Sequence, residues 1–149
     1  MQPFPANAGQ PAFAMVGGNF YEPVAPDGSV DIAVSTTALH LLSGGVENPE
    51  TQAANDLVSF LKSREQELKP NGLLFIIAPA KQSGPTPQSF TATNRVIQGT
   101  LQAAVRSHFI TPQAAKDWFY PSHARTEGEW RAPFTRQVAQ RLTLERIDV

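Results

Sequence analysis

The chain has 149 residues, of which 41% are hydrophobic and 17% charged, and its formal net charge is -1. These values predict one globular domain with an apolar core and exclude an intrinsically disordered chain. The near-neutral charge gives no reason to expect a nucleic acid or a membrane as a partner, and no apolar run approaches the roughly 18 residues of a membrane span. The chain has no cysteine, which excludes disulfides and thiolate chemistry and fits a cytoplasmic location.

The N-terminal part predicts a lead-in followed by two strands. Residues 1–11 are rich in Pro, Gly, Ala and Gln, which is typical of a flexible segment. The sequence AFAMV at 12–16 predicts a short strand that ends at the glycine pair 17–18. After a loop with an Asp-Gly turn signal, residues 30–35 alternate apolar and polar side chains, which predicts a second strand.

Residues 50–68 carry the clearest helical pattern. Their apolar positions recur at helical spacing on one face, with the stem of Arg64 on the same face. Thr51 is the predicted N-cap, and the sequence KPNG at 69–72 is predicted to end the helix. The apolar positions of this face are Leu57, Phe60, Leu61 and Leu68.

The sequence LLFIIA at 73–78 is uninterrupted, apolar and short. Turn signals bound it, so it predicts a strand buried on both faces, as in a parallel sheet. Strand, helix and buried strand in this order predict a βαβ unit.

The second half predicts mainly helices. After a Pro/Ser/Gly loop, helices are expected at about 90–107, 112–118 and 129–140, where Trp130, Phe134 and Val138 are each four residues apart. A last strand is expected at 142–149. Three to four strands with intervening helices indicate an α/β fold with a small Rossmann-like sheet. Either the fold is reduced to its minimum or another chain, in a homo- or hetero-oligomer, completes the sheet.

Two loops follow predicted strands and could contribute to one crevice, because ligands of open α/β sheets bind beyond the carboxyl ends of the strands. These loops are GGNFY, after the first strand, and STTALH, after the second. His40 in the second loop has two interpretations. It is either a core residue held by a backbone carbonyl or a polar group, a donor or general base, that faces the crevice.

Other common catalytic patterns are missing from the sequence. His108 and His123 stand alone, and no cluster of His, Asp and Glu has metal-ligand spacing, so no metal site is predicted. The sequence also lacks a Gly-rich phosphate loop and a nucleophile elbow.

The segments GGNFYEPVAPDGSVDIAVSTTALHLLS and LVSFLKSREQELKPNGLLFIIA together resemble the central part of the SABATH family of S-adenosylmethionine-dependent carboxyl methyltransferases. That family has Gly-Ser-Phe-Tyr, a strand with Ser-Ser, Leu-His-Trp-Leu-Ser, a Phe-Leu…Arg…Glu-Leu helix, Pro-Gly-Gly and a buried strand. The resemblance continues more weakly through residues 108–130. It implies a partial methyltransferase-like domain over 12–149 with a helical cap at about 80–130.

The resemblance also implies roles for individual residues. Asn19, in place of the family's Ser, and Phe20 take the positions that contact the cofactor, S-adenosylmethionine. A further set takes positions that line the acceptor pocket or close the cap over it: Thr37, His40, Leu41, Thr93 and Asn94.

The chain departs from the family pattern at two places. Leu41 stands where the family has a tryptophan donor for the acceptor carboxylate. The family's acidic cofactor loop and its ribose-binding acidic residue have no counterpart before residue 12, so the chain is expected to be a truncated form.

Two functional hypotheses follow. The first is an O-methyltransferase for the carboxyl or phenol group of a small molecule in secondary metabolism. The second is an inactive remnant or accessory protein that binds a small ligand or a partner chain. If the acceptor is a carboxylate, which is ionised near neutral pH, His40 only needs to orient it, whereas a phenol would need His40 as its base.

Overall fold

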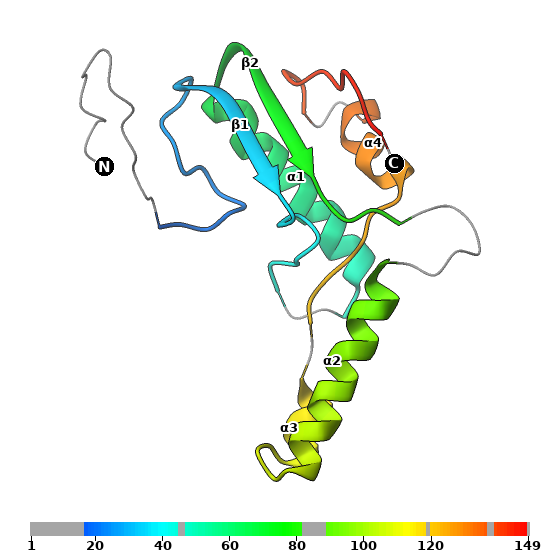
Figure 1. Ribbon diagram of the computed structural model, residues 1–149. Coiled ribbons are helices and arrows are strands. Elements are labelled where there is room, and N and C mark those ends of the chain that lie inside the picture. The colour runs from blue at the N-terminus through cyan, green and yellow to red at the C-terminus, as the bar shows by residue number, and fades with distance from the viewer. Residues whose placement is uncertain (1–16, 45–46, 82–88, 119, 137–138, 149) are drawn as a thin grey trace.

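The computed structural model describes residues 17–44, 47–81, 89–118, 120–136 and 139–148, and the predicted strand at 12–16 lies outside these ranges. Within them the chain forms a two-stranded parallel sheet and four helices (Figure 1). The elements are β1 (Val30–Thr36), α1 (Pro49–Glu67), β2 (Leu68–Ile77), α2 (Ser89–Arg106), α3 (Pro112–Asp117) and α4 (Glu127–Thr135). The βαβ unit β1-α1-β2 is therefore confirmed, and the fold is α/β.

Helix α1 begins earlier than the sequence pattern indicated. Its N-cap is Asn48, whose side-chain oxygen accepts a hydrogen bond from the backbone N–H of Thr51 at 3.1 Å. Pro49 follows at the first helical position, where its missing N–H removes no helical hydrogen bond. The prediction that Thr51 is the N-cap was therefore wrong, because Asn48 and Pro49 together provide a stronger start signal.

The predicted apolar face of α1 forms the centre of the core. Leu57, Phe60 and Leu61 are each only 1% exposed, and Leu39 from the loop after β1 is fully buried against them. Partly buried side chains from both neighbouring layers close this cluster, including Leu74 and Ile76 of β2 and Trp130 and Phe134 of α4.

The predicted end of the helix before KPNG is confirmed to within one residue, since α1 ends at Glu67 with Leu68 as its C-cap. Residues 69–72 do not form a separate turn, however, because β2 begins at Leu68. The register changes from Val30↔Leu68 to Ile32↔Leu73, so residues 69–72 form an irregularity within the strand. Gly72 permits it, since a Cβ at this position would lie 3.0 Å from the Lys69 carbonyl oxygen and 3.2 Å from that of Asp31.

The two faces of the sheet differ sharply in burial. One face carries Leu74 and Ile76 and packs against α1 (Figure 1). The other face remains open among the described residues, so the prediction that β2 is buried on both faces was wrong for this chain. Its apolar side chains, here called the open sheet face, are Ile32 (59% exposed), Val34 (65%), Leu73 (50%), Phe75 (52%) and Ile77 (63%).

The C-terminal half contributes little to the sheet. Helices α2 and α3 pack on each other and extend away from it, whereas α4 lies beside α1 (Figure 1). Helix α4 ends at Thr135, earlier than predicted, and its Arg136 N–H caps the last turn. The strand predicted at 142–149 does not form over residues 142–148, although Leu142 packs on the core. No helix in the described ranges has the length and apolar character needed to cross a membrane.

A pair of phenylalanine substitutions tests this division between core and open face. Replacing Phe60 with Ala should lower the free energy of unfolding by about 3–5 kcal/mol, because it leaves a cavity in the core. Phe75→Ala, the matched control on the open sheet face, should cost about 1 kcal/mol or less. Urea unfolding followed by circular dichroism measures both, and equal losses would show that the open face is buried in solution.

Candidate functional site

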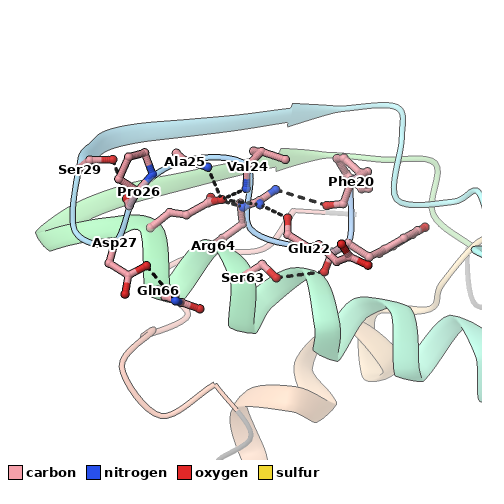
Figure 2. Close-up of polar contacts among 12 residues, drawn as sticks. Phe20, Glu22, Val24, Ala25, Pro26, Asp27, Ser29, Ser63, Arg64 and Gln66 are labelled. Atoms are coloured by element: carbon pink, nitrogen blue, oxygen red, sulfur yellow. Dashed lines mark hydrogen bonds and ion pairs between the residues drawn. The ribbon is translucent and has the colours of Figure 1, made fainter. Parts of the chain in front are cut away.

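The loop that contains Asn19 and Phe20 is fastened to α1 by a buried ion pair (Figure 2). The guanidinium of Arg64 lies 2.6 Å from the Glu67 carboxylate, and both side chains are less than a tenth exposed. Arg64 also donates to the carbonyl oxygens of Phe20 at 3.4 Å and Glu22 at 2.9 Å. The positive charge therefore satisfies loop carbonyls that have no strand or helix partner.

Glu67 and Ser63 extend the attachment along the loop (Figure 2). The Glu67 carboxylate accepts hydrogen bonds from the backbone N–H groups of Val24 and of Ala25, the latter at 2.9 Å. The Ser63 hydroxyl donates to the Tyr21 carbonyl at 3.0 Å. Together these contacts fix the backbone of the loop from residue 20 to residue 25.

The side chains of Asn19 and Phe20 are both engaged within the loop and the core. The Asn19 side-chain oxygen accepts from the Tyr21 N–H at 3.1 Å, and its amide nitrogen donates to Glu22 at 2.9 Å. The Phe20 ring stacks on Phe60 with 4.8 Å between ring centroids. Asn19 is exposed, whereas Phe20 is only partly exposed.

The loop after β1 turns sharply at Thr37, which has φ 54°, a left-handed conformation that is uncommon for a β-branched residue. Its N–H donates to the Ile77 carbonyl at 2.7 Å, so the turn begins at the carboxyl end of the sheet. The hydroxyl of Tyr21 donates to the Leu41 carbonyl at 2.5 Å. This contact joins the two loops, as expected from their positions after the predicted strands.

Residues 120–125 lie alongside this second loop although they follow it by about 80 positions in the sequence. The Leu42 N–H donates to the Pro121 carbonyl at 2.9 Å, and the His123 N–H donates to the His40 carbonyl at 2.7 Å. Leu41 and Ser122 form an antiparallel bridge between these bonds. The segment therefore has a defined position at the edge of the predicted crevice.

His40 is 8% exposed, and its Nε2 lies 3.2 Å from the hydroxyl oxygen of Tyr120. Burial lowers the pKa of His40 below its ordinary value, and the positive charge of Arg125 lowers the pKa further. The imidazole is therefore neutral near pH 7. His40 is therefore buried and has a polar partner, and its orientation toward a ligand stays a prediction.

Arg125 is the largest buried polar side chain near these loops, at 1% exposed. Its guanidinium donates to the carbonyl oxygens of Leu39 and, at 2.6 Å, of Ala53, and it lies 5.3 Å from the centre of the Trp130 ring. Burial lowers the pKa of Arg125, which nevertheless stays protonated at neutral pH. It links the loop after β1, helix α1 and helix α4.

A buried carboxylate orders the end of the same loop. Asp56 of α1 accepts from the Ser43 N–H at 2.9 Å and from the Ser43 hydroxyl at 2.6 Å. Gln52 donates to the same carboxylate at 2.9 Å. Burial raises the pKa of Tyr21, the charge of Asp56 adds to the increase, and Arg125 opposes it, so the Tyr21 phenol stays protonated and able to donate.

The structure gathers some of the predicted site residues and not others. Thr37, His40 and Leu41 share one loop, and Tyr21 connects this loop to the one that carries Asn19 and Phe20. Thr93 and Asn94 lie in the first half of α2, which extends away from the sheet (Figure 1).

Sequence reasoning missed Tyr120 and Arg125. Both belong to the connector between α3 and α4, which has no periodic pattern. The one signal available was the resemblance over 108–130, which marked this connector without indicating what it contacts.

Comparison with known proteins relates the chain to methyltransferases. The O-methyltransferase acrG of Aspergillus aculeatus is 30% identical over an alignment that covers 79% of this chain and 36% of that protein. The methyltransferase LUC1 of a Fusarium species is 28% identical and covers 76% and 34%, respectively. No protein family model matches.

The fold is also that of a methyltransferase. A structure titled as loganic acid methyltransferase with SAH superposes with a TM-score of 0.69 at 23% identity, covering 87% of this chain and 45% of that one. These similarities support a relationship to S-adenosylmethionine-dependent methyltransferases. The chain spans about a third of the length of the curated relatives, 36% and 34%.

The lowered pKa of His40 gives a pH-dependent contribution to stability. Because the unfolded histidine titrates near ~6.5, the unfolded state binds the proton more readily, and stability is lost as pH falls below that value. Wild-type protein should therefore lose more stability between pH 7.5 and 5.5 than His40→Gln does, as measured by urea unfolding. His108→Gln, which removes an exposed histidine, is the control, and parallel profiles for wild type and His40→Gln would contradict the assignment.

Proposed function

We propose that the protein is an S-adenosylmethionine-dependent O-methyltransferase of small-molecule secondary metabolism, located in the cytoplasm, with a carboxyl or phenol group as its acceptor. The observation that carries this proposal is the agreement between sequence and fold, since both relate most of the chain to methyltransferases. The resemblance of the two central segments to the SABATH family supports the same function and suggests a carboxylate as the acceptor.

The described residues fit the cofactor in part. Ser35 lies near the carboxyl end of β1, and its hydroxyl oxygen is buried without a hydrogen-bond partner among the described residues. A polar ligand at this end of the sheet would satisfy it. Asn19, which is exposed, is a second candidate contact and belongs to the loop held by the Arg64–Glu67 pair.

When bound, S-adenosylmethionine supplies a methyl group on a sulfonium, which an acceptor oxygen attacks in an in-line displacement. A carboxylate oxygen attacks without losing a proton, so the protein needs only to hold it in line. A phenol must also lose its proton, and His40 would receive it through the Tyr120 hydroxyl, which lies 3.2 Å from the His40 Nε2. The lowered pKa makes His40 a weak base and favours the carboxylate.

Calorimetric titration with S-adenosylhomocysteine tests the cofactor site. Wild-type protein should show saturable binding and a raised melting temperature. Asn19→Ala should weaken binding several-fold, because it releases the loop turn held by the Asn19 side chain. Phe109→Ala, at a position that is 85% exposed after α2, is the control. No heat and no thermal shift at millimolar cofactor would refute an independent methyltransferase.

A second candidate function is an accessory protein that binds a partner chain, and the open sheet face is the observation that favours it. Five apolar side chains, each at least half exposed, lie side by side on two paired strands. Contiguous apolar patches of this kind mark interaction surfaces. We propose that a second copy of the chain covers this face, because an apolar face is complementary to itself in an isologous dimer.

Light scattering tests this association. The wild-type protein should have about twice the monomer mass of 16.2 kDa. Val34→Asn should shift it to the monomer, whereas Val96→Asn should not, although the two valines are similarly exposed at 65% and 69%. A compact wild-type monomer would refute the second copy and direct the search to a different partner chain.

A further inference from the structure

One asparagine of the chain is followed directly by glycine. Asparagine occurs at six positions, and only Asn71 has a glycine, Gly72, as its next residue. A glycine has no Cβ, so its backbone nitrogen is less hindered than that of any other residue. The side-chain amide carbon of Asn71 therefore has the least hindered backbone nitrogen as its neighbour. The six asparagines are Asn7, Asn19, Asn48, Asn55, Asn71 and Asn94.

Asn71 is exposed and lies in the irregular part of β2. The regular register resumes at Ile32↔Leu73, and in the described sheet residues 69–72 are not register partners of β1. The φ of Asn71 is 63°, a left-handed conformation that asparagine adopts more readily than most residues. Within the described residues, no hydrogen bond holds its side-chain amide. The amide can therefore rotate without disturbing a register pair of the sheet.

The fold itself requires the glycine that follows Asn71. A Cβ at Gly72 would lie 3.0 Å from the carbonyl oxygen of Lys69 and 3.2 Å from that of Asp31. Any larger residue would have to displace one of these backbone atoms. The irregularity in β2 thus places an exposed asparagine amide directly before a residue that has to be glycine.

We infer that Asn71 is a site of spontaneous deamidation in the folded protein. The Gly72 nitrogen, after its proton passes to hydroxide, attacks the side-chain carbonyl carbon Cγ of Asn71. The new N–C bond closes a cyclic imide, the C–N bond of the amide breaks, and ammonia leaves after it takes a proton from water. Because both groups belong to adjacent residues, the step is intramolecular and needs no bound reactant.

Water then opens the imide at one of its two carbonyl groups. Opening at the side-chain carbonyl gives aspartate at position 71. Opening at the main-chain carbonyl gives isoaspartate, whose link to Gly72 runs through the side chain and is one methylene longer. Each product carries a carboxylate, which is ionised near neutral pH, in place of the neutral amide.

The extra length of isoaspartate falls where the two strands are already crowded. The ammonium of Lys69 lies 2.8 Å from the carboxylate of Asp31, so this ion pair joins the beginning of β2 to β1. The carbonyl oxygens of the same two residues lie against Gly72. A longer main chain at residue 71 should therefore displace the beginning of β2 from β1 and lower the melting temperature by several degrees.

Peptide mass spectrometry of the full chain, incubated over a series of mildly alkaline pH values, tests the site. Residue 71 should convert at least several-fold faster than each of the other asparagines, and its rate should rise with pH, because the attacking nitrogen must lose a proton. The reaction needs only water and hydroxide, so it is independent of the proposed methyl transfer. Equal rates at all six asparagines would overturn the assignment.

Two variants connect the conversion to stability. Asn71→Gly removes the amide and keeps a residue that adopts a positive φ, so its melting temperature should stay constant on incubation. Asn55→Ala, which removes another exposed asparagine, should lose stability as the wild type does. A decline in Asn71→Gly as large as that of the wild type would refute the role of residue 71.

The same chain unfolded in urea is the reference for the effect of the fold. Conversion of residue 71 in the folded chain should approach the rate in the unfolded chain, because the amide is exposed and lies outside the register pairs. Conversion in urea with none in the folded chain would show that the fold protects Asn71 and would overturn the inference.

Discussion

The contacts of one buried guanidinium hold the candidate site together. Arg125 enters the core from a connector between two helices and donates to the loop after β1 and to α1, while Trp130 of α4 covers it. Within the part of the chain that the structure describes, these partners are backbone carbonyls and a ring face, and the arginine orders three separate elements there without an ion pair. Removing it would leave buried carbonyls unsatisfied and would free the segment that places Tyr120 beside His40.

Arg64 likewise holds the other loop by donating to its carbonyl oxygens, but its positive charge is paired with the carboxylate of Glu67. Its partner Glu67 is buried with it, so the desolvation of both groups is offset by their mutual attraction and by hydrogen bonds to loop carbonyls and N–H groups. Breaking such a pair commonly costs about 3–5 kcal/mol, because one charge remains uncompensated. Both loops are therefore fixed by polar groups that come from outside the loops.

The sequence predicted those helices and strands whose residue pattern lies within a short stretch of the chain. The period of Leu57, Phe60 and Leu61 defined α1 and its buried face, and the alternation in 30–35 defined β1. The last strand failed because LTLERIDV has an alternating pattern, but strand formation needs a neighbour to pair with. His40 was identified from its place after a strand, whereas Tyr120 was not, because an interaction across 80 positions leaves no local pattern.

The apolar sequence of strand β2 explains why one face of the sheet is packed and the other is open. Its sequence alternates residues that pack on α1, such as Leu74 and Ile76, with equally apolar residues that do not, such as Phe75 and Ile77. A sequence apolar at every position specifies two covered faces, and α1 covers one. The face that α1 covers is therefore packed within the described residues, whereas none of these residues covers the open sheet face.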